Sequence, residues 1–244
     1  MIKTIDISFR INSIGDISDS DTYLNLMGKY NIDYAVIVPT EQAMAVYNKD
    51  GNDLMIDMIK KHPEKIGGYA IANPWYGEKA VNLLKDAFER GLSGLYMAPQ
   101  RQGFKLSEEI IYPLIDVCSV YNKPVYCCTG TPVFSMPFQL AELAQRFPNV
   151  SFIMGHCAWS DFWYDVIPAA KQAENIFIDT SCTTGEAVSG IIAELGSERV
   201  VFSSGCPRSH PIVELNKIKR LDLEENDLTK IMFMNNSKIF GIEI

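Results

Sequence analysis

The sequence VSFIMGHCAWSD spans residues 150–161 and is a short apolar run followed by Gly155 and His156. A preceding helix-like segment ends near Pro148, and a short apolar run bounded in this way predicts a buried parallel strand. Such a strand delivers His156 to its carboxyl end, where α/β folds hold their reactive groups. Taken alone, His156 also has a simpler interpretation as a hydrogen-bonded core histidine.

The same alternation of apolar strand and amphipathic helix recurs along the whole chain. Eight strand–helix units predict one (β/α)8 TIM-barrel domain over residues 1–244, with an extra C-terminal helix in residues 222–242. An open doubly wound sheet is the main rival, but no G-x-G-x-x-G turn follows the first strand. The predicted strands are residues 2–8, 34–39, 65–74, 92–99, 124–130, 150–156, 175–182 and 199–205.

The composition is that of an ordinary globular protein, with 47% hydrophobic and 21% charged residues. A formal net charge of −8 argues against binding to nucleic acids or anionic membranes, so small molecules or proteins are the better partners; the expectation of a small anionic substrate comes from Arg10. The chain has neither a signal-peptide pattern nor an apolar run long enough for a membrane span. Because the six cysteines lie in or beside apolar runs, we expect reduced thiols and a cytoplasmic location.

Two reactive side chains end neighbouring predicted strands. Cys128 follows the fifth strand and His156 the sixth, and adjacent strands lie only about 4.8 Å apart, so these side chains can touch. An imidazole that favours the thiolate makes Cys128 a candidate nucleophile and His156 a candidate acid or base. The alternative is that Cys128 fills space as a small hydrophobe. Cys127 is expected to face the helices.

Arg10 is the third candidate catalytic residue, at the end of the first strand. A fixed guanidinium in a barrel mouth can hold a substrate carboxylate or stabilise an oxyanion. A buried ion pair of Arg10 with Asp6 or Asp179 is the equally weighted alternative. Ser8 and Tyr96 are expected to line the same pocket.

The segment after the eighth strand supplies two further candidates. Arg208 and His210 lie in the PRSHP loop and are expected to contact an anionic substrate. Asp161, just after the central stretch, is expected to cap the helix that follows rather than to orient His156.

Four long stretches of the chain resemble the amidohydrolase-related branch of the amidohydrolase superfamily. They are HPEKIGGYAIANP, GLYMAPQRQGFKLSEEIIYPLIDVCSVYNKPVYCCTG, FPNVSFIMGHCAWSDFWYDVIPAAKQAENIFIDTS and LDLEENDLTKIMFMNNSKIFGI. The resemblance covers nearly the whole chain in order and implies the barrel. The branch contains metal-dependent hydrolases and decarboxylases, among them aminocarboxymuconate semialdehyde decarboxylase and lactone hydrolases.

The resemblance also locates the family's metal ligands, most of which are replaced. Ser8 and Arg10 stand at the family's His-x-His pair, Cys128 at the fifth-strand histidine and Gly205 at the eighth-strand aspartate, while His156 is retained. A divalent ion needs at least three protein ligands, and a guanidinium would repel it. We therefore expect no metal cofactor, with zinc held by Cys128, His156 and Cys206 as a minor alternative.

These features predict a metal-independent hydrolase, similar to a lactonase, or a decarboxylase acting on a small carboxylated substrate. A different class of function is a pseudoenzyme that keeps the barrel and serves as a small-ligand binder or assembly subunit. The resemblance further allows a homodimer. Elemental analysis and ligand screening separate these interpretations.

Overall fold

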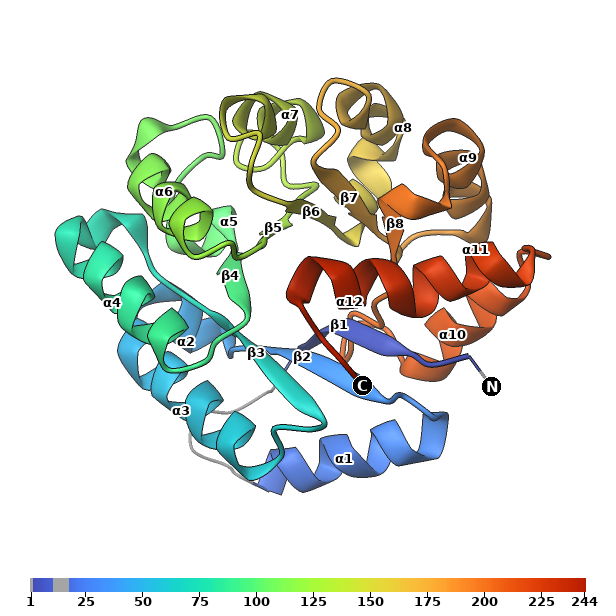
Figure 1. Ribbon diagram of the computed structural model, residues 1–244. Coiled ribbons are helices and arrows are strands. Elements are labelled where there is room, and N and C mark those ends of the chain that lie inside the picture. The colour runs from blue at the N-terminus through green and yellow to red at the C-terminus, as the bar shows by residue number, and fades with distance from the viewer. Residues whose placement is uncertain (1, 11–17) are drawn as a thin grey trace.

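Eight parallel strands follow one another around a curled sheet in sequence order, with helices on the outside, which is the (β/α)8 barrel that the sequence predicts (Figure 1). The computed structural model describes residues 2–10 and 18–244, without the side chains of residues 18–20, 160 and 161. The expectation for Asp161 therefore lies outside the described residues. The strands are β1 (Ile5–Arg10), β2 (Tyr34–Val38), β3 (Ile66–Ala70), β4 (Gly94–Met97), β5 (Val125–Cys128), β6 (Phe152–Gly155), β7 (Ile176–Asp179) and β8 (Val200–Val201).

Helices connect successive strands and cover the outer face of the sheet (Figure 1). Their order is α1 (Ser18–Tyr30), α2 (Glu41–Ala45), α3 (Asn48–Lys61), α4 (Glu78–Glu89), α5 (Pro99–Gln102), α6 (Tyr112–Val120), α7 (Pro137–Arg146), α8 (Trp159–Ala170), α9 (Gly185–Leu195), α10 (Pro211–Lys219), α11 (Glu225–Thr229) and α12 (Asn235–Phe240). Among the helices described, none is long and apolar enough to cross a bilayer.

The strands bury side chains on both faces, as expected of strands in a barrel. One hydrophobic cluster fills the barrel interior and includes Tyr69, Tyr96 and Tyr126, and a second cluster packs the strands against the helices. Cys127 belongs to the outer cluster and Cys128 to the inner one, which confirms the predicted parity of β5. Several buried polar side chains follow the carboxyl ends of the strands, among them Thr129, His156 and Ser203, and the candidate residues lie there.

Near the C-terminus, α12 contacts both β8 and β1, the last and first strands of the sheet (Figure 1). The Asn236 amide donates to the carbonyl oxygens of Ile5 and Phe202, at 2.9 and 3.1 Å. Nearer the carboxyl ends, the Arg10 N–H donates to the Cys206 carbonyl at 2.9 Å. The extra C-terminal helix predicted from the sequence is thus a structural bridge between the first and last strands.

β1 starts later than predicted and contains a register shift. Asp6 pairs with Ala35 and Phe9 with Ile37, so two residues, Ile7 and Ser8, face one residue of β2. A β-bulge of this kind redirects side chains near functional sites. Phe9 consequently packs in the outer cluster, and Arg10 lies at the barrel mouth.

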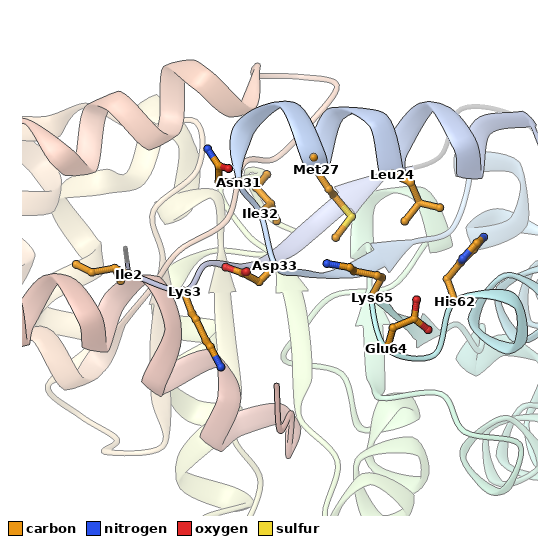
Figure 2. A pocket seen from close by; sticks show the side chains of 11 residues that line it. Ile2, Lys3, Leu24, Met27, Asn31, Ile32, Asp33, His62, Glu64 and Lys65 are labelled. Atoms are coloured by element: carbon orange, nitrogen blue, oxygen red, sulfur yellow. The ribbon is translucent and has the colours of Figure 1, made fainter.

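A cavity of about 490 Å³ lies at the opposite end of the barrel, among residues that precede the first three strands. Figure 2 shows Lys3, Asp33 and Lys65 at its wall. Because TIM-barrel chemistry is located at the carboxyl ends of the strands, this cavity is not the candidate site.

Candidate active site

The Asp179 carboxylate, at the end of β7, organises the floor of the site. It is fully buried and accepts hydrogen bonds from the hydroxyls of Tyr126, Ser181 and Ser203. It also accepts from the backbone N–H groups of His156 (3.0 Å) and Ser181 (2.8 Å). Five donors from four strands and their following turns thereby hold one carboxylate, which gives Asp179 a structural role.

His156 is positioned by this network through Ser181. Its Nδ1 lies 2.9 Å from Ser181 Oγ, which donates its own proton to Asp179 at 2.9 Å. Because a hydroxyl has one proton to give, Ser181 accepts from a protonated Nδ1. The Nε2 atom faces the mouth, 3.4 Å from Nη1 of Arg208. The imidazole is therefore oriented through Nδ1; because a guanidinium only donates, Nε2 accepts from Arg208 in the neutral ring, and this contact is given up when Nε2 carries a proton.

The backbone at His156 adopts an uncommon left-handed conformation. His156, Cys157, Ala158 and Trp159 have φ values of 59°, 47°, 56° and 54°. Positive φ costs a non-glycine residue of order 1–2 kcal/mol, and such strain is concentrated at functional sites. The turn packs against Gly130, where an added Cβ would lie 2.3 Å from the Ala158 carbonyl oxygen. A glycine at residue 130 is thus required for the turn that presents His156.

Cys128 and His156 lie side by side and shift each other's pKa toward the charged forms, thiolate and imidazolium. Burial alone would raise the pKa of Cys128, but the neighbouring His156 and then the Arg208 and Arg10 guanidiniums lower it to about 6. Burial would likewise lower the pKa of His156, but chiefly the Cys128 thiolate raises it to about 9. β5 and β6 bring the two together, because Cys128 pairs in register with Gly155. At neutral pH the pair is charged, as expected for an activated cysteine.

Arg10 lies at the mouth and contacts neither Asp6 nor Asp179. Its Nη2 donates to the Tyr96 hydroxyl at 3.0 Å, and its Nη1 pairs with Glu41 Oε1 at 2.9 Å. The predicted ion pair of Arg10 with one of the two aspartates is therefore wrong. The bulge in β1 and the early helix α2 bring Glu41 there instead.

Arg208 pairs with Glu41, as Arg10 does, whereas His210 lies at the start of α10. The Arg208 guanidinium carbon is 5.2 Å from the centre of the Trp159 ring, a cation–π arrangement that holds it beside His156. His210 caps the start of α10, and its ring packs edge-on to Tyr30 at 5.3 Å. Ser8 is buried near the end of β1, with its N–H bonded to Asp6.

The sequence interpretation missed Glu41, Arg101 and Ser181. Glu41 is the second residue after the strand segment YAVIVP, so a survey of polar residues at every strand end would have included it. Ser181 lies two residues after Asp179, so it too is a polar residue at a strand end that such a survey would have included. Arg101 lies on α5, and only the folded chain shows that it meets Glu41.

Alkylation of Cys128 by iodoacetamide provides a direct check of the thiolate. We expect the rate to rise with a midpoint near pH 6, because deprotonation occurs there. An ordinary thiol shows this midpoint near pH 8.5. Peptide mass spectrometry locates the label, and His156→Gln should move the midpoint upward. Labelling of Cys128 only above pH 8 would contradict the ion pair.

Comparison with known proteins gives a family and a set of similar folds. The family model described as amidohydrolase matches residues 16–242. The structure is similar to 5-carboxyvanillate decarboxylase of Sphingomonas paucimobilis, with 14% identity, a TM-score of 0.80 and full coverage of both chains (100% each). It is also similar to 2,6-dihydroxybenzoate decarboxylase from Rhizobium, with 18% identity, a TM-score of 0.74 and 99% of each chain covered. Comparison with curated proteins gives no match.

A dihydroxybenzoic acid decarboxylase from Polaromonas sp. JS666 contains bound manganese and is similar in fold, with a TM-score of 0.76, 15% identity and coverage of 99% of this chain and 97% of that chain. The present side chains do not fit such an ion. Within the described part of the chain, no three His, Cys, Asp or Glu side chains are grouped to hold a metal.

Two further features of the mouth oppose a divalent cation. Arg10 and Arg208 place fixed positive charge beside Cys128 and His156. At Gly205, where φ is +59°, an added Cβ would lie 3.0 Å from Ser181 Cβ, so an aspartate there would be strained. Cys206 packs toward the outer cluster, whereas Cys128 lies in the inner one, so the described structure does not bring these two together with His156 as zinc ligands.

Proposed function

The chain belongs to the amidohydrolase family, and from this premise we propose that it is a metal-independent hydrolase of small carboxylated esters or lactones. The single observation behind this proposal is that β5 and β6 place Cys128 beside His156, with Arg208 Nη1 3.4 Å from His156 Nε2, an arrangement that lowers the pKa of Cys128 and raises that of His156. A thiolate nucleophile, an imidazolium acid and fixed cations can together perform acyl transfer. Cys128 is buried, with 8% of its surface exposed, so the proposed attack requires the mouth to open toward its Sγ.

In the proposed first step, the Cys128 thiolate attacks the acyl carbon of the substrate. The carbonyl oxygen becomes an oxyanion, which Arg10 and Arg208 stabilise by their charge. The tetrahedral intermediate collapses, the acyl–oxygen bond breaks and His156 Nε2 gives its proton to the departing alkoxide. The products of this step are an alcohol and a thioester on Cys128, with His156 neutral.

In the second step, neutral His156 removes a proton from water, which attacks the thioester. Breakage of the carbon–sulfur bond restores the thiolate and releases a carboxylic acid, which ionises in water. His156 is again an imidazolium, so the protons and charges of the cycle balance. Ser181 and Asp179 keep the ring oriented during both transfers through the Nδ1 side.

We propose that the body of the substrate occupies a cavity that is connected to His156 through Cys182. A cavity of about 670 Å³ lies between α8 and the start of α9, a size suited to a small ligand. Trp163 and Tyr164 form one wall, and Cys182, an interaction partner of His156, forms part of the other. The proposed substrate thus has an apolar body and an anionic end toward the arginines.

Decarboxylation is the second candidate, supported by the similar folds of three decarboxylases. In that reaction the arginines would hold the substrate anion, and His156 would give a proton to the carbon that loses carbon dioxide. No covalent bond to Cys128 forms, which separates the two candidates experimentally.

Turnover of a substrate panel tests the proposed function. Untagged protein is analysed for metals and then assayed with carboxylated lactones, thioesters and hydroxybenzoates, with and without a chelator. We expect ester or lactone hydrolysis that the chelator leaves unchanged. A stoichiometric metal and chelator-sensitive turnover would overturn the metal-free mechanism. Bound ligands without any turnover would instead indicate the pseudoenzyme.

A further inference from the structure

Three arginines from distant parts of the chain meet one carboxylate at the barrel mouth. Arg10 is the last residue of β1, Arg101 lies on α5 and Arg208 follows β8. Glu41 Oε1 hydrogen-bonds to Arg101, is 2.9 Å from Arg10 Nη1 and is 3.6 Å from Arg208 Nη2. We call Arg10, Arg101 and Arg208 the arginine cluster.

The charges within this group do not balance. At the mouth the arginine cluster contributes three positive charges and Glu41 one negative charge, which leaves a local excess of two; the Asp179 carboxylate lies deeper, 3.9 Å from His156 Nδ1, and is not an ion-pair partner of these arginines in the described structure. The Cys128–His156 pair is neutral as a whole at pH 7, so it does not remove that excess. Guanidiniums cannot lose their protons to relieve it. A second negative group is therefore favoured at this point.

The Glu41 carboxylate is placed so that the carboxylate of a ligand can displace it from the arginine cluster. Its side chain is 54% exposed, whereas that of Arg10 is only 11% exposed, so the carboxylate can move into solvent while the cation stays. Partial burial opposes ionisation, but the hydrogen bond from Arg101 and the charges of Arg10 and Arg208 lower the pKa of Glu41. Glu41 thus remains an anion and a permanent competitor.

We propose that Glu41 occupies the anion subsite of the arginine cluster and selects for small molecules with two carboxylates. A monocarboxylate that displaces Glu41 only exchanges one carboxylate for another, so it gains little. A dicarboxylate brings more negative charge than it displaces and gains in net attraction. This inference rests on the proposed function, because it names the class of substrate that the same active site binds.

Calorimetric titration with malonate, succinate and acetate at constant ionic strength tests the proposal. We expect the wild-type protein to bind the two dicarboxylates at least tenfold more tightly than acetate. Glu41→Gln should tighten dicarboxylate binding a further tenfold, because the competing charge is gone. Arg101→Gln should weaken it by a similar factor. Glu194→Gln, which removes an exposed ion pair with Lys171, is the matched control and should change nothing.

Weaker or unchanged binding in Glu41→Gln would overturn the proposal, since Glu41 would then be a support for the arginines rather than a competitor. Arg101→Gln keeps the test decisive if Glu41→Gln does not fold. Turnover of monoanionic esters without any preference for dicarboxylates would sink this inference and leave the proposed function standing. Tighter binding of dicarboxylates without turnover of any ester or lactone would support this inference and contradict the proposed function.

Discussion

Asp179→Asn is expected to lower the free energy of unfolding by about 3–5 kcal/mol, the usual cost of breaking a buried charged network. Each Asp179 oxygen accepts one backbone N–H: Oδ1 accepts from Ser181 and Oδ2 from His156. Whichever way an asparagine amide turns, its NH2 group faces a backbone donor that cannot rotate away. Urea denaturation at pH 7 measures the loss.

Asp6→Asn is the matched control, because Asp6 is equally buried but less well bonded. Its Oδ1 accepts from the N–H groups of Ser8 and Ser204, whereas its Oδ2 has no partner among the described residues. Burial, assisted by the charge of Asp179, raises the pKa of Asp6 to about 6, against the lowering effect of the hydrogen bonds. An asparagine can keep both Oδ1 bonds and carries no buried charge.

The pH dependence of this control follows from the raised pKa. The folded protein binds the Asp6 proton more tightly than the unfolded chain does, so this contribution to stability is present below about pH 4 and lost as pH rises through about 6. Asp6→Asn should therefore stabilise the protein by about 1–3 kcal/mol at pH 8 and by little at pH 3. Equal destabilisation by both substitutions would contradict the assigned hydrogen bonds.

Cys128→Ser is expected to reduce kcat/KM for ester hydrolysis by at least about a thousandfold, or about 4 kcal/mol in transition-state free energy. A serine hydroxyl is not ionised by an imidazole alone near neutral pH, whereas the Cys128 thiol has a pKa of about 6. Initial rates over pH 5–10 and thermal unfolding of both proteins give the comparison. The wild-type rate should rise through about pH 6 and fall through about pH 9, where His156 loses its proton.

The adjacent cysteine supplies the control for this experiment. Cys127 lies on the same strand but faces the helices, and burial raises its pKa. Cys127→Ala should keep the wild-type rate, with only a small loss of stability. A thioester of Cys128 should also be trapped by acid quenching and detected by mass. Decarboxylation that persists in Cys128→Ser would favour the second candidate function.

The regular alternation of strands and helices in the sequence predicted a parallel α/β fold, and the count of eight units favoured the closed barrel over an open sheet. The same pattern placed Cys128 and His156 on neighbouring strands and Cys127 on the outer face. These are consequences of strand order and of the two-residue period of a strand, which are local properties. The replacement of the family's metal ligands is an expectation from the resemblance alone.

Only the tertiary structure decided which charges meet at the mouth. Glu41, Arg101 and Arg208 are separated by up to 167 residues, and their convergence depends on the bulge in β1 and on the short helices after β2 and β4. The left-handed turn at His156 likewise depends on close packing against Gly130. Sequence patterns report which face of an element is buried, whereas long-range ion pairs and strained turns arise from packing between elements, which those patterns do not encode.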